Sequence, residues 1–219
     1  MNTNGLTKPK FVEEFISKAY FRAFTPHRNI KRRYKMDKKQ QIIDESLNVF
    51  VEYGFHGSPI TKLVKSAQVS NGTFFYYFKT KEDLITAIYV STKEEIHRHI
   101  VLDINEVTSV KKSMRDLWMN WTKWGIANKQ KFMFLEIFST SPYINSLEKK
   151  EVADTFIFIK ELLLKGIHDE IIIPMDVTLL SHLFYSSIRT TVMYHQVKPL
   201  SHEEMETIFT IMWKSFVDL

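Results

Sequence analysis

The sequence predicts an all-α protein with an N-terminal three-helix helix-turn-helix domain followed by a C-terminal helical domain. Glycine and proline are scarce, with 6 of each among 219 residues. The long segments between them carry apolar residues at helical spacing. Two short amphipathic segments, residues 58–67 and 70–78, are separated only by Gln68 and Val69. That tight link is what a helix-turn-helix requires.

The composition is that of an ordinary globular protein, with 44% hydrophobic and 25% charged residues. The absence of cysteine excludes disulfides and thiolate metal sites, and it agrees with a reducing cytoplasm. No apolar run reaches the length of a membrane span, and the N-terminus lacks the pattern of a secretory signal. We therefore expect a cytoplasmic protein with no membrane partner.

The charge is unevenly distributed along the chain. Residues 1–89 carry 15 Lys and Arg against 8 Asp and Glu, whereas residues 90–219 carry 15 against 17. A basic N-terminal part beside a mildly acidic remainder favours a polyanionic partner for the first part only. A solvated basic face would give the same count.

The predicted organisation has three parts. Residues 1–35 form an N-terminal extension, with an amphipathic helix over residues 10–24 and a basic linker at residues 28–39. Residues 36–89 form the helix-turn-helix domain. Residues 90–219 form the C-terminal domain, with further helices expected over residues 111–128, 129–139, 147–169, 176–195 and 201–217.

Local signals predict where the helices of the second part begin and end. Gly54 suits the left-handed residue that closes the helix over residues 36–53. Ser58 is expected to be an N-cap, with Pro59 at the first helical position. Ser70 is expected to cap the next helix, and a further helix should run from residue 81 to about residue 101.

Residues 70–78 are open to a second interpretation. Asn71-Gly72 is a hairpin-turn dipeptide, and the aromatic residues that follow favour strands. No second apolar strand precedes Asn71, however, so we favour the helix. Phe74 and Phe78 would then face the core together, since residues four apart share one side of a helix.

The proposed second helix has the chemistry for contact with DNA. Its N-terminus at Ser70 offers free N–H groups at the positive end of the helix dipole, which attracts phosphates. Gly72 would allow the backbone to approach DNA, and Thr73 carries both a hydroxyl and a methyl group. Tyr76 and Tyr77 are expected to face outward, and Lys79 and Lys81 add positive charge.

Residues 40–88 resemble the DNA-binding domain of the TetR/AcrR family of transcriptional regulators. The residues that carry the resemblance are Gly54, Phe55, Ser58, Ile60, Leu63, Ala67, Val69, Ser70, Gly72, Thr73, Tyr76, Phe78, Lys79, Lys81, Glu82, Asp83 and Leu84. The resemblance implies a homodimeric repressor that binds double-stranded DNA. It implies DNA contacts at Ser58, Thr61, Ser70, Gly72, Thr73, Tyr76, Tyr77, Lys79 and Lys81.

The chain departs from the family pattern at two positions. Phe75 stands where the family usually has Tyr, so one phosphate-bonding hydroxyl is missing. Gln68 stands where the turn usually has Gly, and a left-handed Gln costs about 1–2 kcal/mol.

The C-terminal domain of the family is a helical ligand-binding and dimerisation domain. This chain has aromatic and apolar residues there that could serve both roles. Aromatic residues there are candidates for an effector pocket: Trp118, Trp121, Phe134, Phe138, Phe156 and Tyr185. The alternative is that they form an ordinary core. Residues of the last two expected helices are candidates for a dimer interface: Phe184, Ile188, Ile208, Ile211, Met212 and Phe216. The effector would be a small apolar or aromatic molecule.

No enzyme, metal or cofactor signal stands out. Glu95 and His99 are four residues apart on one helix face, and His97 and His99 alternate. A metal site would need a third ligand on the same face and a shielded place. No phosphate loop, catalytic triad order or metalloprotease pair is present. We expect no catalytic residues, no metal ligands and no cofactor. A DNA-bound adaptor without an effector pocket remains the alternative function.

Residues 1–35 precede the part that resembles the family, whose members usually begin close to this domain. Either these residues are an authentic extension with a basic arm that contacts the minor groove, or the assigned start at Met1 is too early. Both interpretations stay open.

Overall fold

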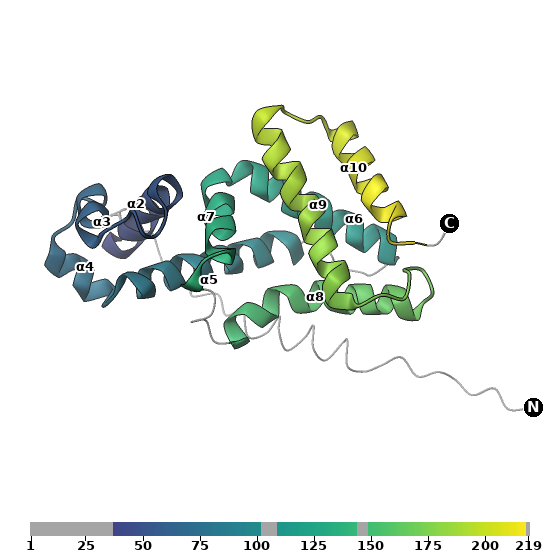
Figure 1. Cartoon of the computed structure of the whole chain (residues 1–219), viewed down its shortest axis with the longest axis horizontal. Helices are drawn as coiled ribbons and strands as arrows, with labels where there is room; N and C mark the ends of the chain where they lie inside the picture. Colours follow the sequence, from purple (N-terminus) through teal and green to yellow (C-terminus); the bar gives the residue numbers. More distant parts are fainter. Residues whose placement is uncertain (1–36, 102–108, 144–148, 218–219) are drawn as a thin grey trace, which may run out of the picture. The chain divides into compact units, whose positions relative to one another are not determined.

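The computed structural model of the chain describes residues 37–101, 109–143 and 149–217. Within these ranges the regular elements are helices, with no strand. The expected helix over residues 10–24 and the extension 1–35 lie outside the described residues. The helices are α2 (Lys38–Tyr53), α3 (Ile60–Ser66), α4 (Asn71–Tyr77), α5 (Lys81–Val101), α6 (Val110–Ala127), α7 (Lys129–Ser139), α8 (Lys149–His168), α9 (Val177–Val197) and α10 (His202–Lys214) (Figure 1). None of the described helices is long and apolar enough to cross a membrane.

The helix ends around the predicted helix-turn-helix follow local chemistry, with one correction. Gly54 closes α2 in the left-handed region, at φ 69°. Gln68 also adopts a left-handed conformation, at φ 50°, in the turn between α3 and α4. The predicted N-cap at Ser58 is wrong, because α3 begins at Ile60 with Pro59 as its N-cap and no side-chain capping bond.

Residues 71–77 form a helix, so the hairpin interpretation is wrong. The backbone N–H of Thr73 donates to Ser70 Oγ at 3.0 Å, which makes Ser70 the predicted N-cap of α4. Phe74 and Phe78 are buried, as their spacing indicated. Their rings hold one side of α4 against the protein, so the other side is left for solvent.

Helix α5 connects the two predicted domains. It is continuous from Lys81 to Val101 and crosses the expected boundary between residues 89 and 90. The described helices belong to one compact unit that begins at Lys38. In this unit α2 packs against α3, α4, α5 and α7. The Phe55 ring, just after α2, lies 5.6 Å from the ring of Phe134 in α7.

The C-terminal helices pack around α6, which contacts α5, α7, α8, α9 and α10. Its largest buried side chains, Trp118 and Trp121, explain why it is central. A capping box formed by Ser201 and Glu204 starts α10. Residues 171–173 continue the turn after α8, where the Ile172 side chain packs closely over Gly166.

Candidate nucleic-acid interface and its supporting core

Helix α4 presents an uncovered side to solvent. The Tyr76 side chain is 75% exposed and the Phe75 side chain 41% exposed. Gly72 on the same helix and Lys79, two residues after its end, are also exposed, while Tyr77 is half-buried, with its ring 4.9 Å from that of Tyr76. This side of α4 therefore carries polar and aromatic groups, as the sequence predicted. Nothing in the described protein covers them.

The N-terminus of α4 is organised by two hydroxyl groups. Ser70 Oγ accepts from the Thr73 backbone and lies 2.9 Å from Thr73 Oγ1. This pair of hydroxyls is exposed to solvent. It leaves the remaining N–H groups of the first turn directed outward, which suits an anionic partner.

Ser58 is placed differently from the expectation. Its side chain is fully buried, and its hydroxyl donates to the Gly54 carbonyl at 2.6 Å, with the Val49 carbonyl at 3.3 Å. The expected contact between Ser58 and DNA is therefore contradicted. Thr61, one turn further on, is exposed and remains a candidate.

The two lysines after α4 lie in different environments. Lys79 Nζ donates to the Phe75 carbonyl at 3.1 Å in an exposed position. Lys81 Nζ donates to the Phe55 carbonyl at 2.9 Å in a partly buried position. Lys81 thus joins the start of α5 to the loop after α2, a structural role that sequence reasoning did not anticipate.

Sequence reasoning also missed a cation–π contact beside this surface. Lys62 Nζ of α3 lies 3.2 Å from the centroid of the Tyr53 ring. Spacing alone could not reveal it, because the two residues belong to different helices.

The predicted effector residues are mostly part of the packed core. Trp118, Trp121, Phe134 and Phe138 are at most 1% exposed. The side chain of Phe156 lies outside the described residues. The remaining residue, Tyr185, is half-buried on α9, with its ring 5.2 Å from that of Trp121.

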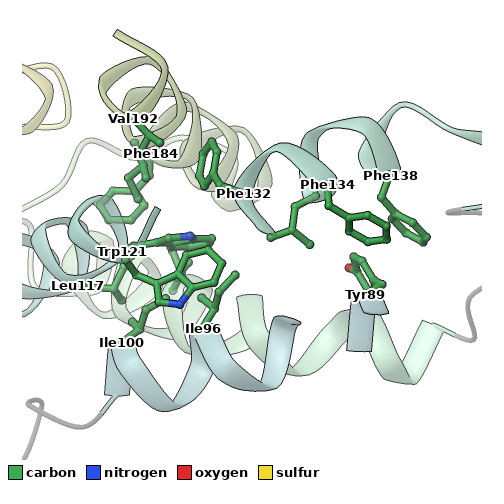
Figure 2. Packing of buried hydrophobic residues seen from close by; sticks show 14 of the residues in the cluster. Tyr89, Ile96, Ile100, Leu117, Trp121, Phe132, Phe134, Phe138, Phe184 and Val192 are labelled. Carbon is green, nitrogen blue, oxygen red and sulfur yellow. The ribbon is translucent and has the colours of Figure 1, made fainter. Parts of the chain in front are cut away.

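These aromatic residues fall into separate groups (Figure 2). Phe138 stacks on Tyr89 at 4.2 Å, beside Phe134, and both phenylalanines also face Phe55. Trp121 lies in a second group with Ile96 and Ile100 (Figure 2). The phenylalanines thus support the joint between α7 and the helix-turn-helix, a role their spacing did not suggest.

A cavity of about 170 Å³ lies between α2, α5 and α7. None of the six predicted effector residues lines it. Its walls combine the apolar side chains Ile43, Leu47 and Ile88 with Gln40, Asp44, Ser91, Thr92, Glu94, Glu95, Arg98 and Lys131. Glu95 is held there by an ion pair with Lys131.

A polar contact joins α7 to α9. Tyr185 Oη donates to Glu136 at 2.7 Å, and Arg189 pairs with the same carboxylate. Burial and the neighbouring Glu136 charge raise the pKa of Tyr185. The phenol therefore stays protonated and keeps its role as a donor.

The candidate dimer residues divide between core and surface. Phe184, Ile188, Met212 and Phe216 are buried within the chain, so they are not available to a partner in this conformation. Ile208 is half-buried, and Ile211 is 66% exposed. On α9 the exposed apolar residues are instead Leu179, Leu183, Tyr194 and Val197.

Comparison with known proteins agrees with this geometry. The family described as "Bacterial regulatory proteins, tetR family" matches residues 42–88. The fatty acid metabolism regulator protein of Bacillus subtilis (strain 168) is 33% identical over 82 residues, which are 37% of this chain and 42% of that protein. The regulator RutR of Escherichia coli (strain K12) is 37% identical over 51 residues, 23% of this chain and 24% of RutR. The chain thus matches less than half the length of these curated relatives.

Similarity to solved structures extends over most of the chain. A protein from Shewanella sp. PV-4, described as a tetR family transcription regulator, has a TM-score of 0.73 and 25% identity, covering 84% of this chain and all of that one. FadR from Bacillus subtilis, solved in complex with stearoyl-CoA, has a TM-score of 0.66 and 20% identity, covering 81% of this chain and 98% of FadR. At that identity the second likeness concerns the fold alone. Residues 42–88 thus carry the DNA-binding domain of the tetR family of bacterial regulatory proteins, and the chain as a whole has the fold of a tetR family regulator.

Proposed function

We propose that this chain is a cytoplasmic, homodimeric transcriptional repressor. It binds a palindromic DNA operator through α4 and leaves the operator when an apolar small molecule binds. The observation that carries the proposal is the uncovered side of α4, with Tyr76 three-quarters exposed beside the open N-terminus at Ser70.

The mode of DNA binding follows from which groups of α4 are accessible. The exposed N-terminus favours a phosphate, and Tyr76 offers a hydroxyl and a ring to the groove. Thr61 and Lys79 add contacts from either side of α4. Two such helices in a dimer would read half-sites one helical turn apart, about 34–36 Å.

The homodimer is supported by exposed apolar residues on the last two helices. Leu179, Leu183 and Val197 lie along one side of α9, since their spacing returns to nearly the same direction. Val197 is 85% exposed, and Ile211 on α10 is 66% exposed. Apolar side chains in such a row are stabilised when a second copy covers them.

We further propose that the effector has a long apolar part, with a fatty acyl thioester as the first class to test. The support is the fatty acid regulator among the relatives and the FadR complex with stearoyl-CoA. Residues around Trp118, Trp121, Phe134, Phe138, Phe156 and Tyr185 would form the binding region. Because several of them are tightly packed, the effector must bind a conformation in which they separate. It releases DNA only if it prefers that conformation.

One observation favours the alternative function, a DNA-bound adaptor with no effector. The core residues proposed for the pocket are almost completely buried, with Phe134 and Phe138 at 0% exposure. In that case the C-terminal domain would act through a protein partner, and a panel of small molecules would leave DNA binding unchanged.

The test begins with selection of bound sequences from random duplex DNA. The selected sequences should contain an inverted repeat, and fluorescence anisotropy should show tight binding that Tyr76→Ala weakens while circular dichroism stays unchanged. Stearoyl-CoA, free stearate and coenzyme A are then added separately. Release of DNA by stearoyl-CoA alone supports the effector class. Unchanged DNA affinity with all three compounds contradicts it, and failure to enrich any sequence contradicts the repressor itself.

A further inference from the structure

Gly72, Phe75 and Tyr76 share one side of α4, because they are spaced three or four residues apart, and Lys79 follows directly after the C-cap residue Phe78. All four are exposed, so this side forms a continuous surface, here called the reading side. Tyr76 and Lys79 are polar at their tips. Phe75 and Gly72 have no polar side-chain atom, and their presence at an exposed surface needs a separate explanation.

Phe75 is not required by the hydrophobic core. The core position on α4 is taken by Phe74, which is completely buried. The two rings meet edge to face, with centroids 5.5 Å apart and planes at 84°. This contact holds the Phe75 ring in place while 41% of the residue remains exposed. A ring of carbon atoms cannot bond a phosphate, so it can contribute to recognition only through apolar contact.

Gly72 is likewise not required by the protein's own packing. A Cβ atom added there would meet only Ser70 Oγ, at an ordinary 3.8 Å. Glycine is a poor helix former, and here no close neighbour within the described protein compensates for it. Its effect is to leave the backbone uncovered one turn before Phe75, which gives room for a close approach from outside.

We propose that Phe75 is a specificity-determining residue that contacts the 5-methyl group of a thymine in the major groove. Gly72 makes the space for that base edge. The thymine methyl is the apolar group that the major groove presents, and aromatic rings are suitable partners for it. The inference rests on the proposed DNA-binding function, and it specifies which chemical group of the operator the reading side recognises.

The experiment uses the full chain and a duplex selected from random DNA. Each thymine in the half-site is replaced in turn by uracil, which removes only the methyl group and keeps the base pair. At one position in each half-site, affinity should fall about fourfold, and about fifteenfold when both half-sites are changed, as expected for loss of one buried methyl group each. Phe75→Ala should bind both duplexes equally at that position.

Two further variants separate base reading from general affinity. Phe75→Leu keeps an apolar side chain and should retain part of the preference for thymine. It also serves as the test variant if Phe75→Ala does not fold. Lys79→Ala should weaken binding to the thymine and uracil duplexes by the same factor, because charge does not distinguish them.

The outcomes are distinct. If wild-type protein binds thymine and uracil duplexes equally at every position, the inference is overturned while the repressor proposal stands. The same holds if Phe75→Ala keeps the full thymine preference. If no duplex is bound specifically, the DNA-binding proposal fails and this contact fails with it.

Discussion

Ser58 shows how one hydroxyl can serve folding instead of recognition. Its buried Oγ donates to the Gly54 carbonyl near the end of α2, while Thr61 nearby is exposed to solvent. Both residues carry a hydroxyl and lie three positions apart. They therefore make a matched pair for separating stability from DNA contact.

We predict opposite effects for the two substitutions. Ser58→Ala should lower the free energy of unfolding by about 1–3 kcal/mol, because a buried carbonyl loses its donor. The folded fraction should bind DNA normally. Thr61→Ala should leave stability within about 0.5 kcal/mol and weaken DNA binding. Urea unfolding and anisotropy measure the two quantities. A stable Ser58→Ala variant with poor DNA affinity would show that this assignment is wrong.

Lys93 gives a prediction about pH. Its side chain is buried on α5, with Nζ 5.6 Å from the centroid of the Tyr89 ring, and burial lowers its pKa from 10.5 to about 8. Between these two values the unfolded chain keeps a proton that the folded protein has released. Stability should therefore rise with pH through that window, and the cost of the buried charge is fully present below about pH 8.

Lys93→Met should remove this cost. We expect the free energy of unfolding at pH 7 to increase by on the order of 2 kcal/mol, and the rise in stability between about pH 8 and pH 10.5 to disappear. Urea titrations at pH 7 and across that range measure both effects. The exposed Lys123 provides the control, since Lys123→Met should keep the wild-type pH dependence. An unchanged pH profile in Lys93→Met would contradict the prediction.

At the scale of whole helices, α9 carries two different apolar sides. Phe184 and Ile188 face the interior, whereas Leu179 and Leu183 face solvent. The inner side holds the helix on α6, and the outer side is available for a second copy. The two sides explain why apolar residues occur on more than one face of α9.

We predict that Leu183→Glu breaks the proposed homodimer without unfolding the chain. Leu183 is 46% exposed, so a charged side chain is tolerated by the protomer but not in an apolar interface. Sedimentation velocity should show a monomer, and circular dichroism should remain helical. Thr178→Glu, also exposed on α9 but away from this row, should stay dimeric. A dimeric Leu183→Glu variant would place the interface elsewhere.

At the scale of the whole molecule, the two interpretations of residues 1–35 make different predictions for DNA binding. The compact unit of described helices begins at Lys38. The basic run at residues 28–39 falls largely before it. The two interpretations of this extension therefore differ in DNA affinity rather than in folding.

A chain starting at Met36 should fold and dimerise like the full chain, because the described helices form a compact unit that begins after that residue. If the extension is a working arm, its removal should weaken DNA binding and reduce the magnitude of the salt slope, because every phosphate that the arm neutralises adds about 0.9 to that slope. The full chain with Arg28, Lys31, Arg32, Arg33 and Lys35 changed to Gln should then behave like the shortened one. Equal affinity and salt slope in all three proteins would exclude an arm.

Several features could be predicted from the sequence because they depend on neighbouring residues only. The left-handed Gly54, the N-cap at Ser70 and the capping box at Ser201 are all decided within one helical turn. The range of α5, Lys81–Val101, follows from an acidic first turn and a sustained apolar stripe. The helix-turn-helix could be predicted from the sequence for the same reason, since its two helices and the turn between them lie in one short stretch.

Which apolar residues are buried and which remain exposed could not be predicted, because it depends on contacts between residues that are distant in the sequence. Ile211 and Met212 are adjacent and both apolar, yet one is 66% exposed and the other is buried, because α10 packs on α6 and α9 at one particular rotation. Phe134 and Phe138 support the joint with Phe55, far away in sequence, rather than an open pocket. Helical periodicity gives an apolar stripe, but only packing against other helices determines which of its residues face the interior and which remain for a partner.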